Sequence, residues 1–273
     1  MAYVSWPSMM MNDNENAEVF LARGLFESAQ DLDCRFYGIQ RPYTVTDVLT
    51  RCLKQSTNDP YTNEQIWQWT LPQRLQGLLA IVIASGQATI NTLGTCHVCS
   101  EITELELDLH SFIDNRSEKM LLVEPEPGVR LKVEIPNGYH QLEWMGLDNN
   151  QLDEDNELDM ATSLTQSVND KPLPVDWCMP RHWLDHVQTA LEECDPFTAF
   201  SITVDCPNCS ETMTLEPDLE ELLLRKLESS HKAVLEEVYY LARAYHWTEV
   251  EIFNLPVWRR RYYMQCYQHE DRI

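Results

Sequence analysis

Hydrophobic residues recur at helical spacing in several stretches of the chain. The clearest stretch is LPQRLQGLLAIVIASG, in which Pro72 suits a first helical turn and Gly86 suits a stop. One side of this predicted helix is apolar, and it consists of Leu75, Leu78, Leu79, Val82 and Ile83. Looser helical patterns cover residues 17–33, 46–54 and 63–69, the second of them capped by Thr44 or Thr46. We therefore predict an N-terminal helical extension over residues 1–70.

The last quarter of the chain is also helical in pattern. From Leu219 to Ala242 apolar residues recur mostly at spacings of three and four, which predicts a long helix that ends near Trp247. Thr248 and Glu251 form a capping box for a short helix, and Pro256 opens a last one. Residues 219–273 are therefore predicted to be a C-terminal helical segment. A shorter helix is expected over residues 181–193.

Alternating apolar and polar residues predict strands between these helices. Residues 129–135 alternate strictly and are followed by a turn at Asn137-Gly138, which predicts a β-hairpin. Residues 200–204 alternate as cleanly, and shorter alternating stretches lie at residues 88–93, 105–109 and 213–215. The chain is therefore predicted to have the α+β fold class.

A repeat connects the strands of the two halves. The sequence CHVCSEITELELDL begins at Cys96, the sequence CPNCSETMTLEPDL begins at Cys206, and eight of their fourteen positions are identical at an offset of 110. Each copy places a Cys-x-x-Cys turn between two predicted strands, which is the pattern of a zinc knuckle. The chain is either a duplicated unit or two halves built on one plan.

One knuckle supplies only two thiolates, whereas structural zinc takes four ligands. We therefore predict that Cys96, Cys99, Cys206 and Cys209 bind a single zinc ion, as a split zinc ribbon with flanking helices. The first half, residues 71–147, would carry the first knuckle and the β-hairpin, and the second half, residues 173–218, the second knuckle. The alternatives are two separate sites completed by other residues, for which His97 and His110 are weaker candidates, and a reduced site without metal. A redox role fits poorly, because neither pair opens a helix after a βαβ pattern.

The five remaining cysteines are scattered singly and are expected to be small buried hydrophobes; they are Cys34, Cys52, Cys178, Cys194 and Cys266. Phosphate-binding and hydrolase motifs such as GxxxxGK[ST], HExxH and GxSxG are missing. We predict a protein that is not an enzyme.

The charge of the chain is strongly acidic. Forty-four acidic against 20 basic side chains give a net charge of −24, which repels nucleic acids and anionic membranes and favours protein partners. Residues 148–172 are predicted to be an acidic linker, either a solvated connector or a docking segment for a basic neighbour. The start of the chain has no signal-peptide pattern, and no apolar run could span a membrane, so we expect a protein made and retained in the cytoplasm.

Basic and aromatic residues gather only near the C-terminus. This cluster consists of Trp258, Arg259, Arg260, Arg261, Tyr262 and Tyr263. Stacking of bases on these aromatics is disfavoured by the net charge. We expect either a solvated cationic face or a contact with another subunit.

Two stretches resemble proteins encoded with contractile phage tails and contractile injection systems, related to the T-even phage baseplate hub and hub-assembly proteins. The first stretch has a helix that opens LPxRxxxLL, here from Leu71, then a CxxC and a strand that ends in IPNG at Gly138. The second has the knuckle CPNC, a strand, a long helix and the run AYHWTEVEIFNLPVWRR from Ala244 to Arg260. Residues 1–70 lie outside the resemblance. Ser100 and Ser210 replace the glycines usual after the second cysteine.

The resemblance implies a structural baseplate component, incorporated into a tail or injection-system particle, that docks on other baseplate, hub or spike proteins. Two other functions are open at this point. One is an assembly chaperone that leaves before the particle is finished. The other is a zinc-ribbon adaptor for nucleic acid, which the net charge disfavours.

Overall fold

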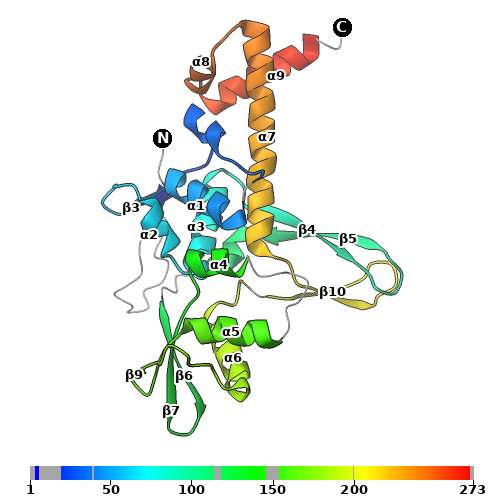
Figure 1. The fold of residues 1–273 in the computed structure, drawn as a ribbon. Helices are drawn as coiled ribbons and strands as arrows, with labels where there is room; N and C mark the ends of the chain where they lie inside the picture. The colour runs from blue at the N-terminus through cyan, green and yellow to red at the C-terminus, as the bar shows by residue number, and fades with distance from the viewer. Residues whose placement is uncertain are drawn as a thin grey trace.

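The computed structural model describes residues 4–5, 20–38, 40–113, 118–145, 154–198 and 200–270. The fold mixes helices and antiparallel sheets, as the α+β prediction requires, and consists of a body, a lower lobe, a C-terminal helical end and a projecting arm (Figure 1). Among the described residues, no helix has both the length and the apolar character needed to cross a bilayer.

The body is built from helices around one hydrophobic core. Its elements are α1 (Arg41–Cys52), α2 (Asn63–Trp67), α3 (Leu71–Ala84), the first turns of α7 (Leu219–Tyr245), and a three-stranded sheet of β1 (Val4–Ser5), β2 (Phe20–Ala22) and β3 (Leu53–Gln55). Val45, Leu49, Leu78, Ile81 and Leu223 are fully buried in this core. The α3 prediction is confirmed, including Pro72 in its first turn.

The helix predicted over residues 17–33 is wrong. In the described part of this segment, residues 20–22 form β2, which pairs with β3, and Ala29–Asp33 form a 3-10 helix, η1. Phe26 adopts a left-handed backbone with φ of 69°, and Arg23 forms a buried ion pair with Asp31 at 2.7 Å. The apolar spacing here comes from a strand and a turn, and the strand's partner lies about thirty residues away in the sequence.

The first body helix also begins earlier than predicted. α1 starts at Arg41 with Pro42 in its first turn, so neither Thr44 nor Thr46 is its cap. The Thr46 hydroxyl instead donates a hydrogen bond to the Pro42 carbonyl at 2.8 Å.

The lower lobe has its own core. A four-stranded sheet in the order β6-β7-β8-β9 is covered by two helices; its elements are β6 (Met120–Glu126), β7 (Val129–Glu134), α5 (Glu154–Leu164), β8 (Thr165–Val168), β9 (Lys171–Pro172), η3 (Arg181–Trp183) and α6 (Leu184–Cys194). Residues 154–172 of the predicted acidic linker are therefore part of a packed lobe, in which Ala161 and Leu164 are buried. Residues 148–153 lie outside the described residues. The β6–β7 hairpin turns at Gly128, with φ of 84°.

Asn137 and Gly138 join the lobe to the body instead of forming the predicted turn. The Asn137 side chain caps α4 (Gly138–Trp144), and the Leu71 amide donates to the Pro136 carbonyl at 2.8 Å. A Cβ added to Gly138 would lie 2.8 Å from both Arg74 and Trp67. The opening of α3 and the IPNG segment, both part of the family resemblance, therefore contact each other.

Arg74, from the LPxRxxxLL pattern, is completely buried at this junction. Its guanidinium donates to the carbonyls of Ile66 and Pro42 and to the Thr46 hydroxyl. Burial lowers the Arg74 pKa to about 10, partly opposed by Glu220. Because its partners come from α1 and α2, the predicted boundary at residue 70 falls inside the body.

The C-terminal helical end follows the prediction closely. α7 ends at Tyr245, His246 turns the chain with φ of 55°, and Thr248 and Glu251 form the expected capping box of α8 (Glu249–Phe253). The last helix, α9 (Val257–Glu270), crosses the end of α7 at the top of Figure 1. A small core formed by Val238, Leu241 and Ile252 holds the three helices together.

The arm, defined as the β4–β5 and β10–β11 hairpins, projects sideways from the body (Figure 1). Its strands are β4 (Thr89–Thr95), β5 (Ile102–Asp108), β10 (Ile202–Asp205) and β11 (Thr212–Leu215), where the sequence pattern predicted them. At its base, Ile90 and Leu109 enter the body core and the Phe112 ring contacts Phe200. The far end of the arm lies outside that core.

Candidate metal centre

The two Cys-x-x-Cys turns have the same backbone geometry. In the first turn the Cys96 amide donates to the Glu101 carbonyl at 2.9 Å, and the Ser100 amide donates to the Cys96 carbonyl at 2.9 Å. In the second turn the equivalent bonds join Cys206 to Glu211 at 2.8 Å and Ser210 to Cys206 at 2.9 Å. The repeat seen in the sequence is thus a repeat of local structure.

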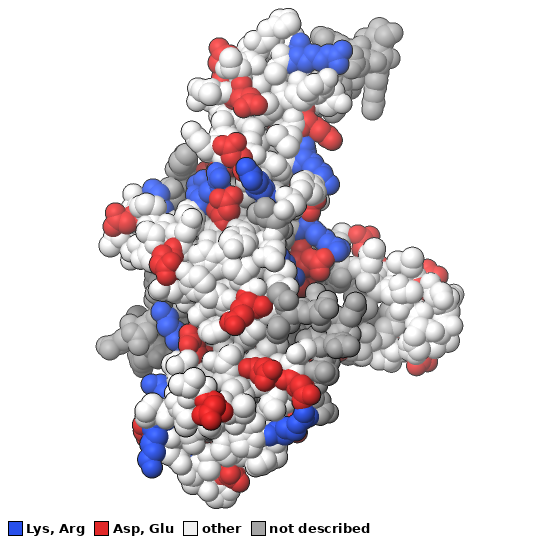
Figure 2. All heavy atoms as spheres, in the orientation of Figure 1, with Lys and Arg blue, Asp and Glu red and all other residues white. Residues whose placement is uncertain are grey.

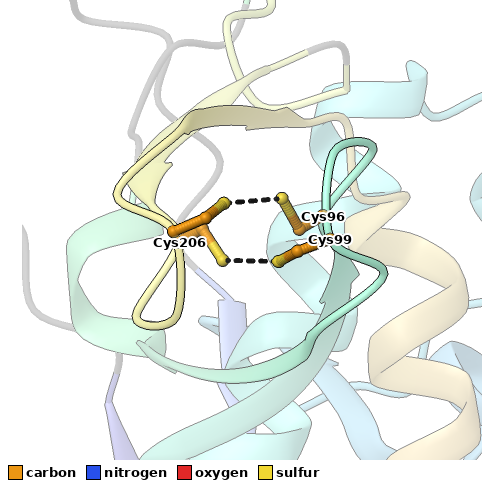
Figure 3. Close-up of side chains that lie close together, drawn as sticks. Cys96, Cys99 and Cys206 are labelled. Atoms are coloured by element: carbon orange, nitrogen blue, oxygen red, sulfur yellow. Dashed lines mark hydrogen bonds between the residues drawn. The ribbon is translucent and has the colours of Figure 1, made fainter.

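The two hairpins bring four cysteine sulfurs together. Cys96 and Cys99 face Cys206 and Cys209 across the arm, as Figure 3 shows for the pairs of sulfurs joined by dashed lines. The Sγ atoms of Cys96 and Cys209 are 3.6 Å apart, those of Cys99 and Cys206 are 3.5 Å apart, and all four lie within 4.8 Å of one another. The predicted convergence of the four cysteines is confirmed.

The spacing of the sulfurs suits a metal ion. With zinc–sulfur bonds of about 2.3 Å, tetrahedral coordination places sulfurs about 3.8 Å apart, close to the two pairs measured here. Disulfides would need sulfur–sulfur distances of about 2 Å, so the four groups are free thiols. The cluster can therefore hold one metal ion, whereas two separate sites would need the hairpins to be apart.

The site is enclosed on one side. Cys96 and Cys206 are buried, Cys99 is partly buried and Cys209 is exposed. Met213 and Val204, which lie on the second hairpin, pack against the sulfurs. These few residues form all of the small core described at the far end of the arm, so a bound ion would add most of the cohesion there.

The thiols affect each other's protonation. The Glu101 backbone and the Asn208 side chain hydrogen-bond to Cys99 and lower its pKa to about 6. At Cys209 the Glu211 backbone acts in the same direction, but desolvation and the neighbouring thiols outweigh it and raise the pKa to about 12. Without a cation the cluster thus favours partial ionisation, and a divalent ion would favour four thiolates.

The histidines considered as ligands lie elsewhere. His97 is exposed, with its Nε2 atom 4.0 Å from a Glu211 carboxylate oxygen, and His110 belongs to the 3-10 helix η2 (Leu109–Phe112) that follows β5. Neither joins the four-cysteine cluster. Of the single cysteines, Cys34 and Cys52 are buried as predicted, whereas Cys178 is exposed, and Cys194 and Cys266 are partly exposed.

Sequence reasoning missed two residues of the centre. One is Asn208, and the other is Gly94, where an added Cβ would lie 2.8 Å from the Leu215 side chain of the second hairpin. Gly94 therefore allows the two hairpins to approach. A comparison of the two copies at the offset of 110 could have found both residues, because the copies differ at these positions. Asn208 is equivalent to Val98, and Gly94 is equivalent to Val204.

The predicted partner-binding cluster on α9 is divided between surface and interior. Trp258 and Tyr262 are 70% and 59% exposed, and Arg259 and Arg261 are exposed beside them. Arg260 is only 3% exposed, lies over the Phe253 ring and is 3.7 Å from Glu237. Tyr263 packs on Tyr245 and Trp247. Arg260 and Tyr263 therefore belong to the packing of the helical end and not to a free surface.

The comparisons with known proteins add no relatives. No protein-family model, curated protein or solved structure matches the chain.

Proposed function

We propose that the chain is a structural, non-enzymatic baseplate component of a contractile phage tail or a related contractile injection system. One zinc ion, held by Cys96, Cys99, Cys206 and Cys209, closes a split zinc ribbon. The observation that carries this proposal is the convergence of four sulfurs from two hairpins 110 residues apart in the sequence. The assignment to a contractile particle rests on the sequence resemblance to baseplate hub and hub-assembly proteins.

A four-thiolate site suits a structural role better than a catalytic one. Catalytic zinc keeps a coordination position open for water or substrate, whereas four cysteines fill the tetrahedron. When bound, zinc would supply cross-linking without redox chemistry. The lower lobe lies between the two hairpins in the sequence. It is therefore an insertion into the ribbon, and a zinc ion that joins the hairpins would also join the two ends of this insertion.

Zinc content tests the metal centre. Elemental analysis of protein purified without chelator should give about one zinc per chain, because the two Cys-x-x-Cys pairs supply one tetrahedral set. A value of two, or of none, would contradict the shared site.

Particle composition tests the function. A tagged chain expressed with its tail or injection-system genes should sediment with intact particles and remain there after washing. A chain that is needed for assembly but absent from finished particles would identify an assembly chaperone. A chain that is absent and dispensable would refute both functions.

The exposed part of α9 is the proposed contact with a neighbouring baseplate protein, because Trp, Tyr and Arg are enriched at the centres of interfaces. A combined Trp258→Ala, Arg259→Glu and Arg261→Glu variant, with Arg260 retained, should stay folded with zinc bound but enter particles at least tenfold less. The matched control is Lys132→Glu with Arg225→Glu, which changes exposed cations elsewhere. Equal incorporation of the two variants would place the contact away from α9.

A further inference from the structure

The first hairpin carries three exposed apolar side chains. Leu93, Val98 and Ile102 are 67%, 60% and 64% exposed. Leu93 lies opposite Glu104 in the β4–β5 pairing and Ile102 lies opposite Thr95. Leu93 and Ile102 share a face, and it is opposite the one where Gly94 meets the second hairpin. Val98 lies in the turn that joins the two strands. We call Leu93, Val98 and Ile102, with the neighbouring Glu104 and Glu106, the arm face.

The repeat supplies an internal comparison for this face. At the offset of 110 the counterparts of Leu93, Val98 and Ile102 are Thr203, Asn208 and Thr212. All three counterparts are exposed as well, so the second hairpin meets solvent with polar side chains at the same positions. The turn geometry and the thiol cluster therefore do not require apolar residues there. Three exposed apolar residues at equivalent positions of only one copy indicate a contact with another molecule.

The charge of the arm selects the kind of molecule. Residues 88–113 and 200–218, which contain the whole arm, include no Lys or Arg, and Figure 2 shows acidic but no basic side chains at its far end. Two of the carboxylates are held on the arm face: Asn91 donates to Glu104 at 2.7 Å and Thr89 donates to Glu106 at 3.3 Å. A complementary surface would present apolar side chains bordered by Lys or Arg.

We propose that the arm face docks a protein other than this chain, through an apolar patch bordered by basic side chains on that protein. A second copy is a poorer fit, because each copy carries a net charge of −24 and the copies repel one another. This inference does not rest on the proposed baseplate function. Its test needs the full chain in the cells that produce it, but it does not need assembled particles.

Site-specific photo-crosslinking tests the proposal. Benzoylphenylalanine is placed at position 98 of the full chain in the producing cells, and at position 212, the exposed counterpart of Ile102 on the second hairpin, as the control. We expect position 98 to give one main adduct, with the crosslinked peptide lying beside Lys or Arg residues of the partner. Position 212 should give at least tenfold less. Zinc content and thermal unfolding of each variant show that the arm is intact.

Substitutions added to the position-98 probe test each part of the recognition. Leu93→Thr with Ile102→Thr, which copies the second hairpin, should lower the adduct at least tenfold. Glu104→Lys with Glu106→Lys should do the same, whereas Thr203→Lys with Thr214→Lys on the other hairpin should not.

Four results would overturn the proposal. The first is equal crosslinking from positions 98 and 212. The second is an adduct with another copy of the chain. The third is an adduct that persists in the Glu104→Lys and Glu106→Lys variant. The fourth is entry of the chain into particles without a position-98 adduct, which would leave the baseplate function standing.

Discussion

Ser100 and Ser210 both have a left-handed backbone in the candidate metal centre. Their φ angles are 60° and 59°, in the left-handed region that glycine adopts without steric cost. Each directly follows the second cysteine of its turn, where the resembled family usually has glycine. The strain is the cost of reversing the chain so that both sulfurs of a turn point to the same side.

Replacing either serine by glycine should stabilise the metal-bound arm. We expect Ser100→Gly and Ser210→Gly each to increase the free energy of unfolding of the arm by about 0.5–1 kcal/mol. This is the net of two effects, because glycine removes the steric cost of the left-handed conformation but also gives the unfolded chain more freedom. Competition with a chelator should then show zinc held roughly two- to fivefold more tightly. Ser100→Ala is the control, because alanine keeps the steric cost, and a gain as large as that of Ser100→Gly would disprove the explanation.

At the scale of elements, the sequence was informative where a signal is local. α3, α7 and α8 were predicted with their stops or caps, because Pro72, Gly86 and the Thr248–Glu251 capping box act within a few residues. The hairpins of the arm were predicted from alternation and from the repeat. The four clustered cysteines were found because two Cys-x-x-Cys pairs in register are rarely accidental.

The errors occurred where long-range packing decides the structure. β2 is a strand because β3 offers a partner, and α5 belongs to a lobe because the β6–β7 hairpin covers its apolar side. An acidic segment with few apolar residues gives no local sign of such packing. Arg260 is buried because α7 and α8 close over it, although its two neighbours in the sequence are exposed.

The contact between the two hairpins can be tested at Gly94. A valine there would meet Leu215, so Gly94→Val should separate the hairpins and weaken zinc binding by about tenfold, equivalent to about 1.4 kcal/mol. Leu215→Ala in the same chain should restore most of the affinity by making room for the valine. Zinc titration of both single variants and the double variant gives the coupling. Additive losses would show that the two residues act independently.

On the scale of the whole molecule, the arm and the body have separate cores. The body core is extensive and includes α1, α3 and the start of α7, whereas the far end of the arm has only the cysteines with Met213 and Val204. A zinc ion would thus stabilise a peripheral structure built on a body that is held together by hydrophobic packing. The consequence is that metal loss should be a local event.

Removal of one ligand from either hairpin should therefore have the same local effect. Cys96→Ser and Cys206→Ser, 110 residues apart, should each lower zinc affinity on the order of a hundredfold or more, because each deletes one thiolate of the same ion. Amide hydrogen exchange should accelerate in β4, β5, β10 and β11 of both variants, and likewise in wild-type protein treated with chelator, while α1 and α3 keep their protection. Cys34→Ser, at a buried cysteine of the body, is the control that should leave exchange in the arm unchanged. If Cys96→Ser accelerated exchange only in the first hairpin, the two hairpins would not share one ion. If α3 lost protection together with the arm, the body would not be independent of the metal centre.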